Sequence, residues 1–315
     1  MTPLDPERFV TATTEVRGFE QAFTHEGVGG IPLLLVHGWP ETRRIWWRCI
    51  EPLVLAGFEV IAPDLRGFGD TDLGHDGFGD VPSHARDLEA LFRSLGHERI
   101  IAVGGDLGGP IIQDLSLRFP GLVDRMVLFN SPLPYVPAMS GLRTRPPMDV
   151  IDYFIRQATD SDALASELTT PEQRRRYIAT FYTSRLWAHP GAFDADEVAF
   201  LTEPFGDGDK LRGSFRAYES TFSESARSEP SAMATPNPTP TLVLYGPSDH
   251  VIYPDFDRMA EIVFPNRVGP FLLRDCGHFV QWEAADRLVG AITAFGAGTA
   301  RWESATDAGE VGREA

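Results

Sequence analysis

The chain has 315 residues, enough for one large α/β domain with an insertion, and 43% of them are hydrophobic and 23% charged. Its net charge of -17 argues against nucleic acid or an anionic membrane as a partner, because phosphate groups are bound by clustered Lys and Arg. Only Cys49 and Cys276 occur as cysteines and MTPLDPERFV has no signal-peptide pattern, so we expect a cytoplasmic protein without disulfides, structural zinc or a membrane span.

Short apolar runs of strand length recur along the chain and predict a parallel sheet. They are IPLLLV (31–36), FEVIAP (58–63), RIIAVG (99–104), RMVLFN (125–130), TLVLYG (241–246) and GPFLLR (269–274). Each run is apolar throughout rather than alternating, which is typical of strands covered by helices on both faces. A helical pattern between Asp80 and Gly96 separates the second and third runs. The alternation of strand and helix predicts an α/β fold with a mostly parallel central sheet.

The alternation stops between two proline-rich stretches, SPLPYVP and ATPNPTPT. Helical patterns replace the apolar runs there, over 148–157, 171–187 and 211–222. We therefore expect a helical insertion at 133–238, joined by stiff linkers to a core formed by 1–132 and 239–300. The small and charged residues of 301–315 predict a disordered tail.

The third apolar run ends in VGGDLGG, which places Asp106 among glycines just before a helical run, Ile111 to Leu117. One interpretation is a helix cap, because Asp is a favoured N-cap residue. The other is a nucleophile elbow, a strained turn between strand and helix whose small neighbours let the backbones pass closely. A carboxylate in such a turn can attack carbon and form an ester. A dinucleotide motif is excluded, because G-x-G-x-x-G starting at Gly104 would need Gly at position 106.

Two further titratable residues follow apolar runs in the second half of the chain. Asp249 lies in GPSDHVI after the fifth run, and His278 lies in DCGHFVQWE after the sixth. Taken separately, Asp249 is equally typical of a turn, and a lone His is commonly structural. Together with Asp106 they follow the chain order nucleophile, acid, base of a hydrolytic triad. An ester intermediate needs a general base with an orienting group, so we interpret His278 as the base and Asp249 as its partner.

The first apolar run ends in LLLVHGWPE, with a glycine-bearing turn at Gly38. Alone, this turn is equally consistent with an ordinary strand end in which His37 bonds its own loop. A hydrolytic site needs backbone N–H donors directed at a developing oxyanion. We expect the amides of Trp39 and Leu107 to supply them.

The acidic loop DTDLGHDGFGD does not predict a calcium site, because an EF-hand begun at Asp70 would place Val81 at its twelfth position.

These motifs resemble those of epoxide hydrolases of the α/β-hydrolase fold, in the branch with haloalkane dehalogenases that uses an Asp nucleophile. The resemblance rests on HGWPETRRIWWRCIEPLVLAGFEVIAPDLRGFGDTD, on the Asp106 elbow and on the acid and His loops, and covers nearly the whole chain except the tail. It implies a cap domain with two tyrosines that hold the epoxide oxygen. Tyr153 in VIDYF matches the first and Tyr218 in FRAYE is similar to the second, although Glu219 stands where the family often has Arg. Rival tyrosines are Tyr177, Tyr182 and Tyr135.

The resemblance implies that Asp106 opens a small apolar epoxide and forms an ester. Water activated by His278 would then hydrolyse this ester to a vicinal diol, without a cofactor or metal. Helix and loop aromatics of the insertion are the candidate substrate-lining residues, namely Phe154, Trp187 and Phe215. The expected partners are the epoxide and a second copy of the chain in a homodimer.

Two alternatives stay open. A haloalkane or haloacid dehalogenase would use the same Asp nucleophile, but the similar dehalogenases carry Trp or Arg after it, where this chain has Leu107. A hydrolase-fold binding protein would hold a ligand under the cap without turnover. The complete triad pattern argues against a binding protein, because ligand binding does not require all three residues.

Overall fold

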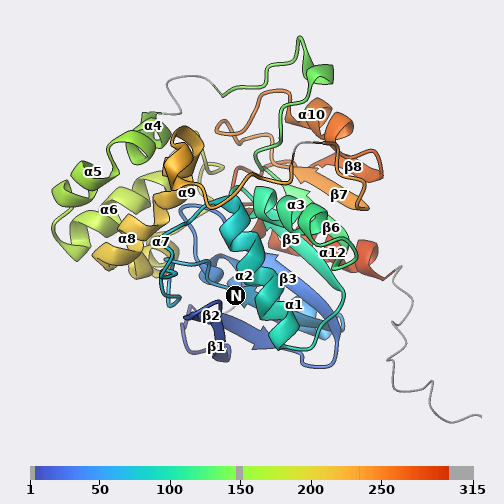
Figure 1. The fold of residues 1–315 in the computed structure, drawn as a ribbon, viewed down its shortest axis with the longest axis horizontal. Helices are drawn as coiled ribbons and strands as arrows, with labels where there is room; N and C mark the ends of the chain where they lie inside the picture. Colours follow the sequence, from blue (N-terminus) through green and yellow to red (C-terminus); the bar gives the residue numbers. More distant parts are fainter. Residues whose placement is uncertain (1–3, 147–151, 234, 298–315) are drawn as a thin grey trace, which may run out of the picture.

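Eight strands form one mixed sheet in the computed structural model, which describes residues 4–146, 152–233 and 235–297 (Figure 1). The strand order is β1-β2-β4-β3-β5-β6-β7-β8. Strands β3 to β8 run parallel, and β1 and β2 are antiparallel at one edge. The strands are β1 (Thr11–Val16), β2 (Phe19–Glu26), β3 (Ile31–Val36), β4 (Phe58–Pro63), β5 (Ile100–Gly105), β6 (Val123–Phe129), β7 (Thr241–Tyr245) and β8 (Arg267–Leu272).

The six apolar runs form β3 to β8, so the predicted α/β fold with a mostly parallel sheet is confirmed. The strands β3 and β4 have the predicted bounds, whereas β6 and β8 each begin two residues before the predicted start, at Val123 and Arg267. Every residue of β4 and β5 is buried, as expected for inner strands with helices on both faces. The apolar character of these strands therefore reflects their position inside the sheet.

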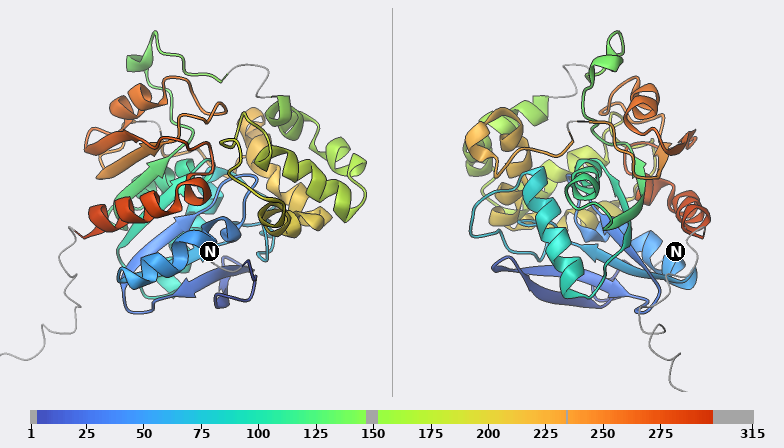
Figure 2. Two further views of the ribbon diagram at one scale, coloured as in Figure 1. Left: turned by 180° about the vertical axis from the view of Figure 1, so that it is seen from behind. Right: turned by 45° about the vertical axis from the view of Figure 1, so that its right-hand side comes forward.

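Helices cover both faces of the sheet. On one face α1 (Trp47–Leu55) packs with α12 (Ala285–Gly296), and on the other α2 (Val81–Ser94) packs with α3 (Gly108–Arg118), as the opposite views of Figures 1 and 2 show. Two shorter helices, α10 and α11, follow β7 and β8, at Phe256–Val263 and Val280–Glu283. None of the helices within the described ranges is long and apolar enough to cross a membrane.

Between β6 and β7 the described residues contain helices and no strand. These helices are α4 (Asp152–Thr159), α5 (Ser161–Glu167), α6 (Pro171–Tyr182), α7 (Ala195–Thr202), α8 (Gly208–Ser214) and α9 (Arg216–Phe222). We call residues 152–222 the helical segment; Figure 1 shows it gathered on one side of the sheet. The predicted start of α4 at position 148 and the predicted tail at 301–315 lie outside the described residues.

Two predicted helices of this segment differ from the observed ones. The helix predicted over 171–187 ends at Tyr182, after which the chain turns and brings Trp187 back against His278, with ring centroids 4.6 Å apart. The helix predicted over 211–222 is interrupted at Phe215, whose side chain is fully buried between α8 and α9. In both places tertiary packing overrides a continuous helical pattern, because bending the chain buries a large aromatic ring.

A buried histidine of α2 gives the first testable prediction. His84 is 1% exposed, and burial together with the charge of Arg66 lowers its pKa well below the usual value. As the pH falls below about 6.5 the unfolded chain takes up a proton at His84 while the folded chain does not. The free energy of unfolding should therefore lose about 1.4 kcal/mol per pH unit from this residue.

The variant His84→Leu lacks this proton uptake. Its stability relative to the wild type, measured by urea unfolding, should rise steadily as the pH is lowered from about 7 to about 5. His75→Leu serves as the control, because it makes the same replacement at an exposed histidine. Parallel pH curves for His84→Leu and the wild type would show that His84 does not resist protonation.

Candidate active site

Asp106 occupies the turn between β5 and α3 in a conformation unusual for a side-chain-bearing residue. Its φ is +44°, in the left-handed region. The N-cap of α3 is Leu107, which makes no side-chain capping hydrogen bond. The Asp106 carboxylate instead accepts a hydrogen bond at Oδ1 from the Trp39 N–H, at 2.7 Å. The capping interpretation therefore fails, and the side chain is directed away from its own helix.

Glycines make this turn possible. A Cβ atom on Gly108 would lie 2.4 Å from the Val36 carbonyl oxygen, and one on Gly38 would lie 2.5 Å from the Asp106 Cβ. Both distances are far below a normal contact, so the loop after β3 and the start of α3 can approach each other only without side chains. The glycines of VGGDLGG thus serve the close approach that a nucleophile elbow requires.

The two other triad candidates lie together at the same edge of the sheet. His278, in the loop after β8, hydrogen-bonds through Nδ1 to Asp249 Oδ2 at 2.8 Å. Asp249 Oδ1 accepts the N–H groups of Val251 and Ile252, at 2.8 and 3.2 Å, which fixes the carboxylate. Nε2 of His278 lies 3.3 Å from Asp106 Oδ2 without forming a hydrogen bond. The three residues therefore have the geometry of a nucleophile, a base and an orienting acid.

The electrostatic setting of His278 favours the protonated ring. Burial alone would lower its pKa, but the charges of Asp249 and Asp106 outweigh burial and raise the pKa well above the usual value. Loss of the negative charge on Asp106 would remove one of these two contributions. The proton affinity of His278 thus depends on the chemical state of Asp106.

A glutamate that the sequence analysis did not assign holds the Trp39 turn in place. Glu41 is 2% exposed, accepts the Gly38 N–H at 2.6 Å, and accepts Nε2 of Gln281 at 2.7 Å. Burial raises the pKa of Glu41 to about 7, although both hydrogen bonds favour its ionised form. The local signal by which it could have been identified is its place in HGWPE, two residues after Trp39.

A second unassigned residue, Asn130, joins the loops that carry the triad. It follows β6, has a φ of +34°, and accepts the Asp106 N–H at its carbonyl oxygen, at 2.9 Å. Its side-chain amide donates to the Gly277 carbonyl at 2.7 Å and accepts the Gly246 N–H at 2.9 Å. Asn130 therefore links the elbow, through its backbone carbonyl, to the acid loop and the His loop, which its side chain joins. Sequence reasoning had no pattern for such a residue, because its partners come from three distant segments.

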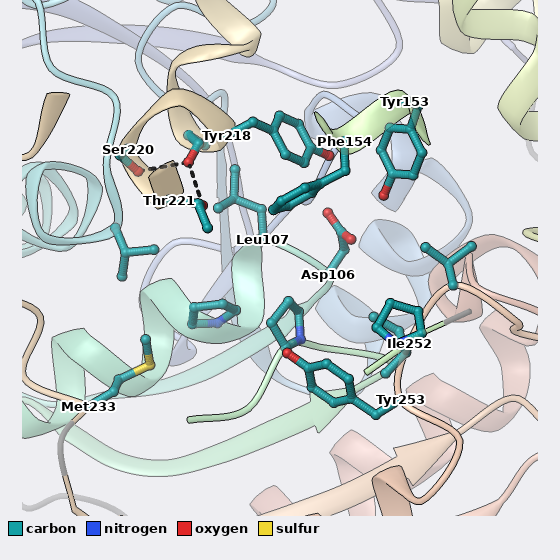
Figure 3. A pocket seen from close by; sticks show the side chains of 16 residues that line it. Asp106, Leu107, Tyr153, Phe154, Tyr218, Ser220, Thr221, Met233, Ile252 and Tyr253 are labelled. Atoms are coloured by element: carbon teal, nitrogen blue, oxygen red, sulfur yellow. Dashed lines mark hydrogen bonds between the residues drawn. The ribbon is translucent and has the colours of Figure 1, made fainter. Parts of the chain in front are cut away.

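Two tyrosines of the helical segment face the Asp106 carboxylate across a cavity. Tyr153 comes from α4 and Tyr218 from α9, and Figure 3 shows both hydroxyl groups directed to the space above Asp106. Burial raises the pKa of each hydroxyl well above its usual value, and the charge of Asp106 raises both further. Both tyrosines therefore remain proton donors throughout the ordinary pH range.

The rival tyrosines lie elsewhere. The Tyr177 hydroxyl accepts a hydrogen bond from Gln157 at 2.9 Å, the Tyr182 hydroxyl donates to the Pro40 carbonyl at 2.5 Å, and Tyr135 is 63% exposed. None of the three belongs to the described lining of the cavity. Of the tyrosines considered from the sequence, Tyr153 and Tyr218 are thus the pair that lines the cavity with Asp106.

The cavity has a volume of about 400 Å³ and is lined mainly by apolar side chains. Phe154 lines it, as expected. Trp187 and Phe215 are outside the described lining, a difference from the sequence expectation. Trp187 packs between Tyr153 and His278, and Phe215 is enclosed at the α8–α9 junction. Trp187 therefore contacts a lining residue, Tyr153, without belonging to the described lining itself.

Metal ligation has no candidate in the part of the chain that the structure describes, where no group of three or more His, Cys, Asp or Glu is arranged around a common point. In the acidic loop after β4, Asp76 pairs with Arg66 at 2.7 Å. This ion pair holds the acid-rich loop in place. Both cysteines are buried and free.

An elbow, an acid loop and a His loop at the carboxyl ends of parallel strands define the class of α/β-hydrolases. The model of the alpha/beta hydrolase fold family matches residues 31–285, and the chain belongs to this family. A soluble epoxide hydrolase of Corynebacterium sp. (strain C12) is 27% identical over 278 residues, which are 85% of this chain and 90% of that protein.

Other relatives show that the family includes different activities. The 2-hydroxy-6-oxo-2,4-heptadienoate hydrolase of Pseudomonas putida is 27% identical over 275 residues, 82% of this chain and 86% of that protein. Among solved structures, the epoxide hydrolase CorEH without ligand has a TM-score of 0.79 at 22% identity, covering 92% of this chain and 99% of that one. At this identity the structural likeness shows the fold, so the reaction has to be argued from the site.

Proposed function

We propose that this protein is an epoxide hydrolase that converts an apolar epoxide to a vicinal diol through an ester on Asp106. The observation that carries the proposal is the placement of two protonated tyrosine hydroxyls, Tyr153 and Tyr218, opposite the Asp106 carboxylate. The insertion at 133–238 acts as a cap over the core, and a reducing cytoplasm is the expected location.

In the first half-reaction, Asp106 attacks a carbon of the oxirane ring. Oδ1 is held by the Trp39 N–H, so Oδ2 is the attacking atom. The new bond joins Oδ2 to carbon while the carbon–oxygen bond of the ring breaks. The ring oxygen takes a proton from a tyrosine hydroxyl and becomes an alcohol. The product is a hydroxyalkyl ester on Asp106, and no atom of the substrate leaves.

In the second half-reaction, His278 takes a proton from water, whose oxygen attacks the ester carbonyl carbon. Esterification has removed the charge of Asp106, which lowers the pKa of His278 and makes it a base when it is needed. The oxyanion forms at Oδ1, where the amides of Trp39 and Leu107 stabilise it. The ester bond then breaks and the alkoxide takes the proton held by His278. The second proton of the water, now on the Asp106 carboxyl, passes to the tyrosinate, and the diol leaves.

A dehalogenase is a weaker proposal because none of the described side chains that line the cavity carries an N–H donor for a halide. Leu107 has no side-chain donor, and the indole N–H of Trp39 donates to Ser214 Oγ at 3.1 Å. A halide that leaves the substrate carbon could therefore accept hydrogen bonds from hydroxyl groups, but not from the indole N–H of Trp39. An epoxide oxygen stays attached to its carbon and needs a proton, which the tyrosines supply.

The proposal predicts that the tyrosines matter for ring opening and for no other reaction of Asp106. Tyr153→Phe and Tyr218→Phe should each lower the rate of epoxide opening about 10²-fold, and the double variant should lower it further. Single-turnover kinetics with styrene oxide measure this step directly. Hydrolysis of an ester already formed on Asp106 should change little, because its charge develops at Oδ1.

The matched control is Tyr135→Phe, since Tyr135 is exposed and outside the cavity. Its rate of epoxide opening should equal that of the wild type. Undiminished epoxide opening in the double variant would contradict the proposed role of the tyrosines. Turnover of haloalkanes with no turnover of epoxides by the wild type would favour the dehalogenase instead.

A further inference from the structure

Residues that line the cavity lie on both sides of the nucleophile. In Figure 3, Thr221 and Met233 lie on one side of Asp106 and Ile252 lies on the other, and all belong to the same cavity. We call the part near Thr221 and Met233 the Met233 arm, and the part near Ile252 and Tyr253 the Ile252 arm. The reacting carbon must sit at Asp106, between the two arms.

The walls of both arms offer little to a polar substituent. In the Ile252 arm, the hydroxyl of Tyr253 is hydrogen-bonded to the Leu133 backbone. In the Met233 arm the hydroxyls of Ser220 and Thr221 donate to the Ala217 carbonyl, at 2.7 and 3.4 Å, and the dashed lines of Figure 3 mark these bonds. The remaining described lining of the cavity outside the reacting groups is mainly aliphatic or proline, namely Val81, Leu107, Pro110, Pro132, Pro146, Met233, Val251 and Ile252.

Charged side chains are equally scarce in this lining. Asp106 is the one charged residue among the described residues that form the cavity wall, and no Lys or Arg is among them. An anionic substituent would lose its water without gaining a counter-ion, and a hydroxyl would lose hydrogen bonds. Both arms therefore favour hydrocarbon.

Building on the proposed function, we propose that the substrate is an uncharged internal epoxide with a hydrocarbon group on each ring carbon. One group enters the Met233 arm and the other enters the Ile252 arm, while the ring oxygen faces Tyr153 and Tyr218. A terminal epoxide fills a single arm. Each methylene transferred from water to an apolar wall increases kcat/KM about fourfold, so filling both arms has a large effect.

Two isomers with the same formula test this geometry, 4,5-epoxyoctane and 1,2-epoxyoctane. The wild-type chain should hydrolyse the internal isomer with a kcat/KM at least about tenfold higher, because three carbons enter each arm. A kcat/KM for 1,2-epoxyoctane that equals or exceeds that for 4,5-epoxyoctane would overturn the inference. If that turnover still requires Asp106, the proposed function survives.

Variants that block one arm at a time test whether Met233 and Ile252 contact the two hydrocarbon groups of the substrate. Met233→Trp and Ile252→Trp should each lower kcat/KM for 4,5-epoxyoctane at least about tenfold, and by more than they lower kcat/KM for propylene oxide, which is small enough to avoid both arms. Tyr135→Trp, outside the cavity, should change neither rate. Retention of the wild-type kcat/KM for 4,5-epoxyoctane in both arm variants would overturn the inference. Absence of diol from all three epoxides with the wild type would overturn the proposed function, and the inference with it.

Discussion

Replacing Asp106 with Asn should abolish turnover of every epoxide, with a fall in kcat/KM of about 10⁴-fold or more. An amide oxygen is a poor nucleophile, so neither the ester nor the diol can form by the proposed route. Asn is the appropriate replacement, because it tolerates the φ of +44° at this position and can still accept the Trp39 N–H. The effect is measured as diol formation by the purified variant.

A matched variant separates loss of the nucleophile from loss of structure. Asp275→Asn makes the same chemical change at an exposed residue that also has a positive φ, three positions before His278. It should retain the wild-type kcat/KM. Diol formation by Asp106→Asn at more than a few per cent of the wild-type rate, with the amide still present by mass, would rule out Asp106 as the nucleophile.

Replacing His278 with Gln should stop the reaction after one half-turnover. Asp106 and both tyrosines remain, so the ring opens, but no base activates the water that hydrolyses the ester. We expect consumption of about one equivalent of epoxide per active site, followed by a steady rate at least about 10³-fold below that of the wild type. Rapid quenching and measurement of the remaining epoxide give both values.

The Asp249 partner provides the comparison for this variant. Asp249→Asn keeps an imidazole beside Asp106 but removes the carboxylate that orients it, so its steady rate should lie between those of His278→Gln and the wild type. Steady multiple turnover by His278→Gln at the wild-type rate would show that hydrolysis of the intermediate does not depend on this base.

The inner part of the sheet could be predicted because strands that are buried on both faces consist mainly of apolar residues. Strands β3 to β5 are buried on both faces and appear as apolar runs, interrupted at Glu59 in β4. The β1–β2 hairpin was missed because β1 is an edge strand of alternating exposure, TATTEV. Its two-residue turn, Arg17-Gly18 with both φ values positive, lacks the usual Asn-Gly or Asp-Gly signal.

The residues of the candidate site also fall into two groups, those that a local sequence pattern predicts and those that it does not. Asp106, Asp249 and His278 each follow a recognisable apolar run, and parallel strands bring their carboxyl ends to one edge. Asn130 could not be assigned because its hydrogen bonds join distant segments, which no local sequence pattern indicates. Long-range packing, rather than helix propensity, likewise decided which aromatic side chains of the helical segment reach the cavity.

The most direct test of the central claim is the intact mass of His278→Gln after exposure to 4,5-epoxyoctane, followed by peptide mapping. The account predicts a gain equal to the whole mass of the epoxide, because no atom leaves, and it places the adduct on the peptide that contains Asp106. The double variant Asp106→Asn/His278→Gln should gain no mass. An adduct on another residue, or an adduct that persists in the double variant, would contradict the assignment of Asp106 as the nucleophile.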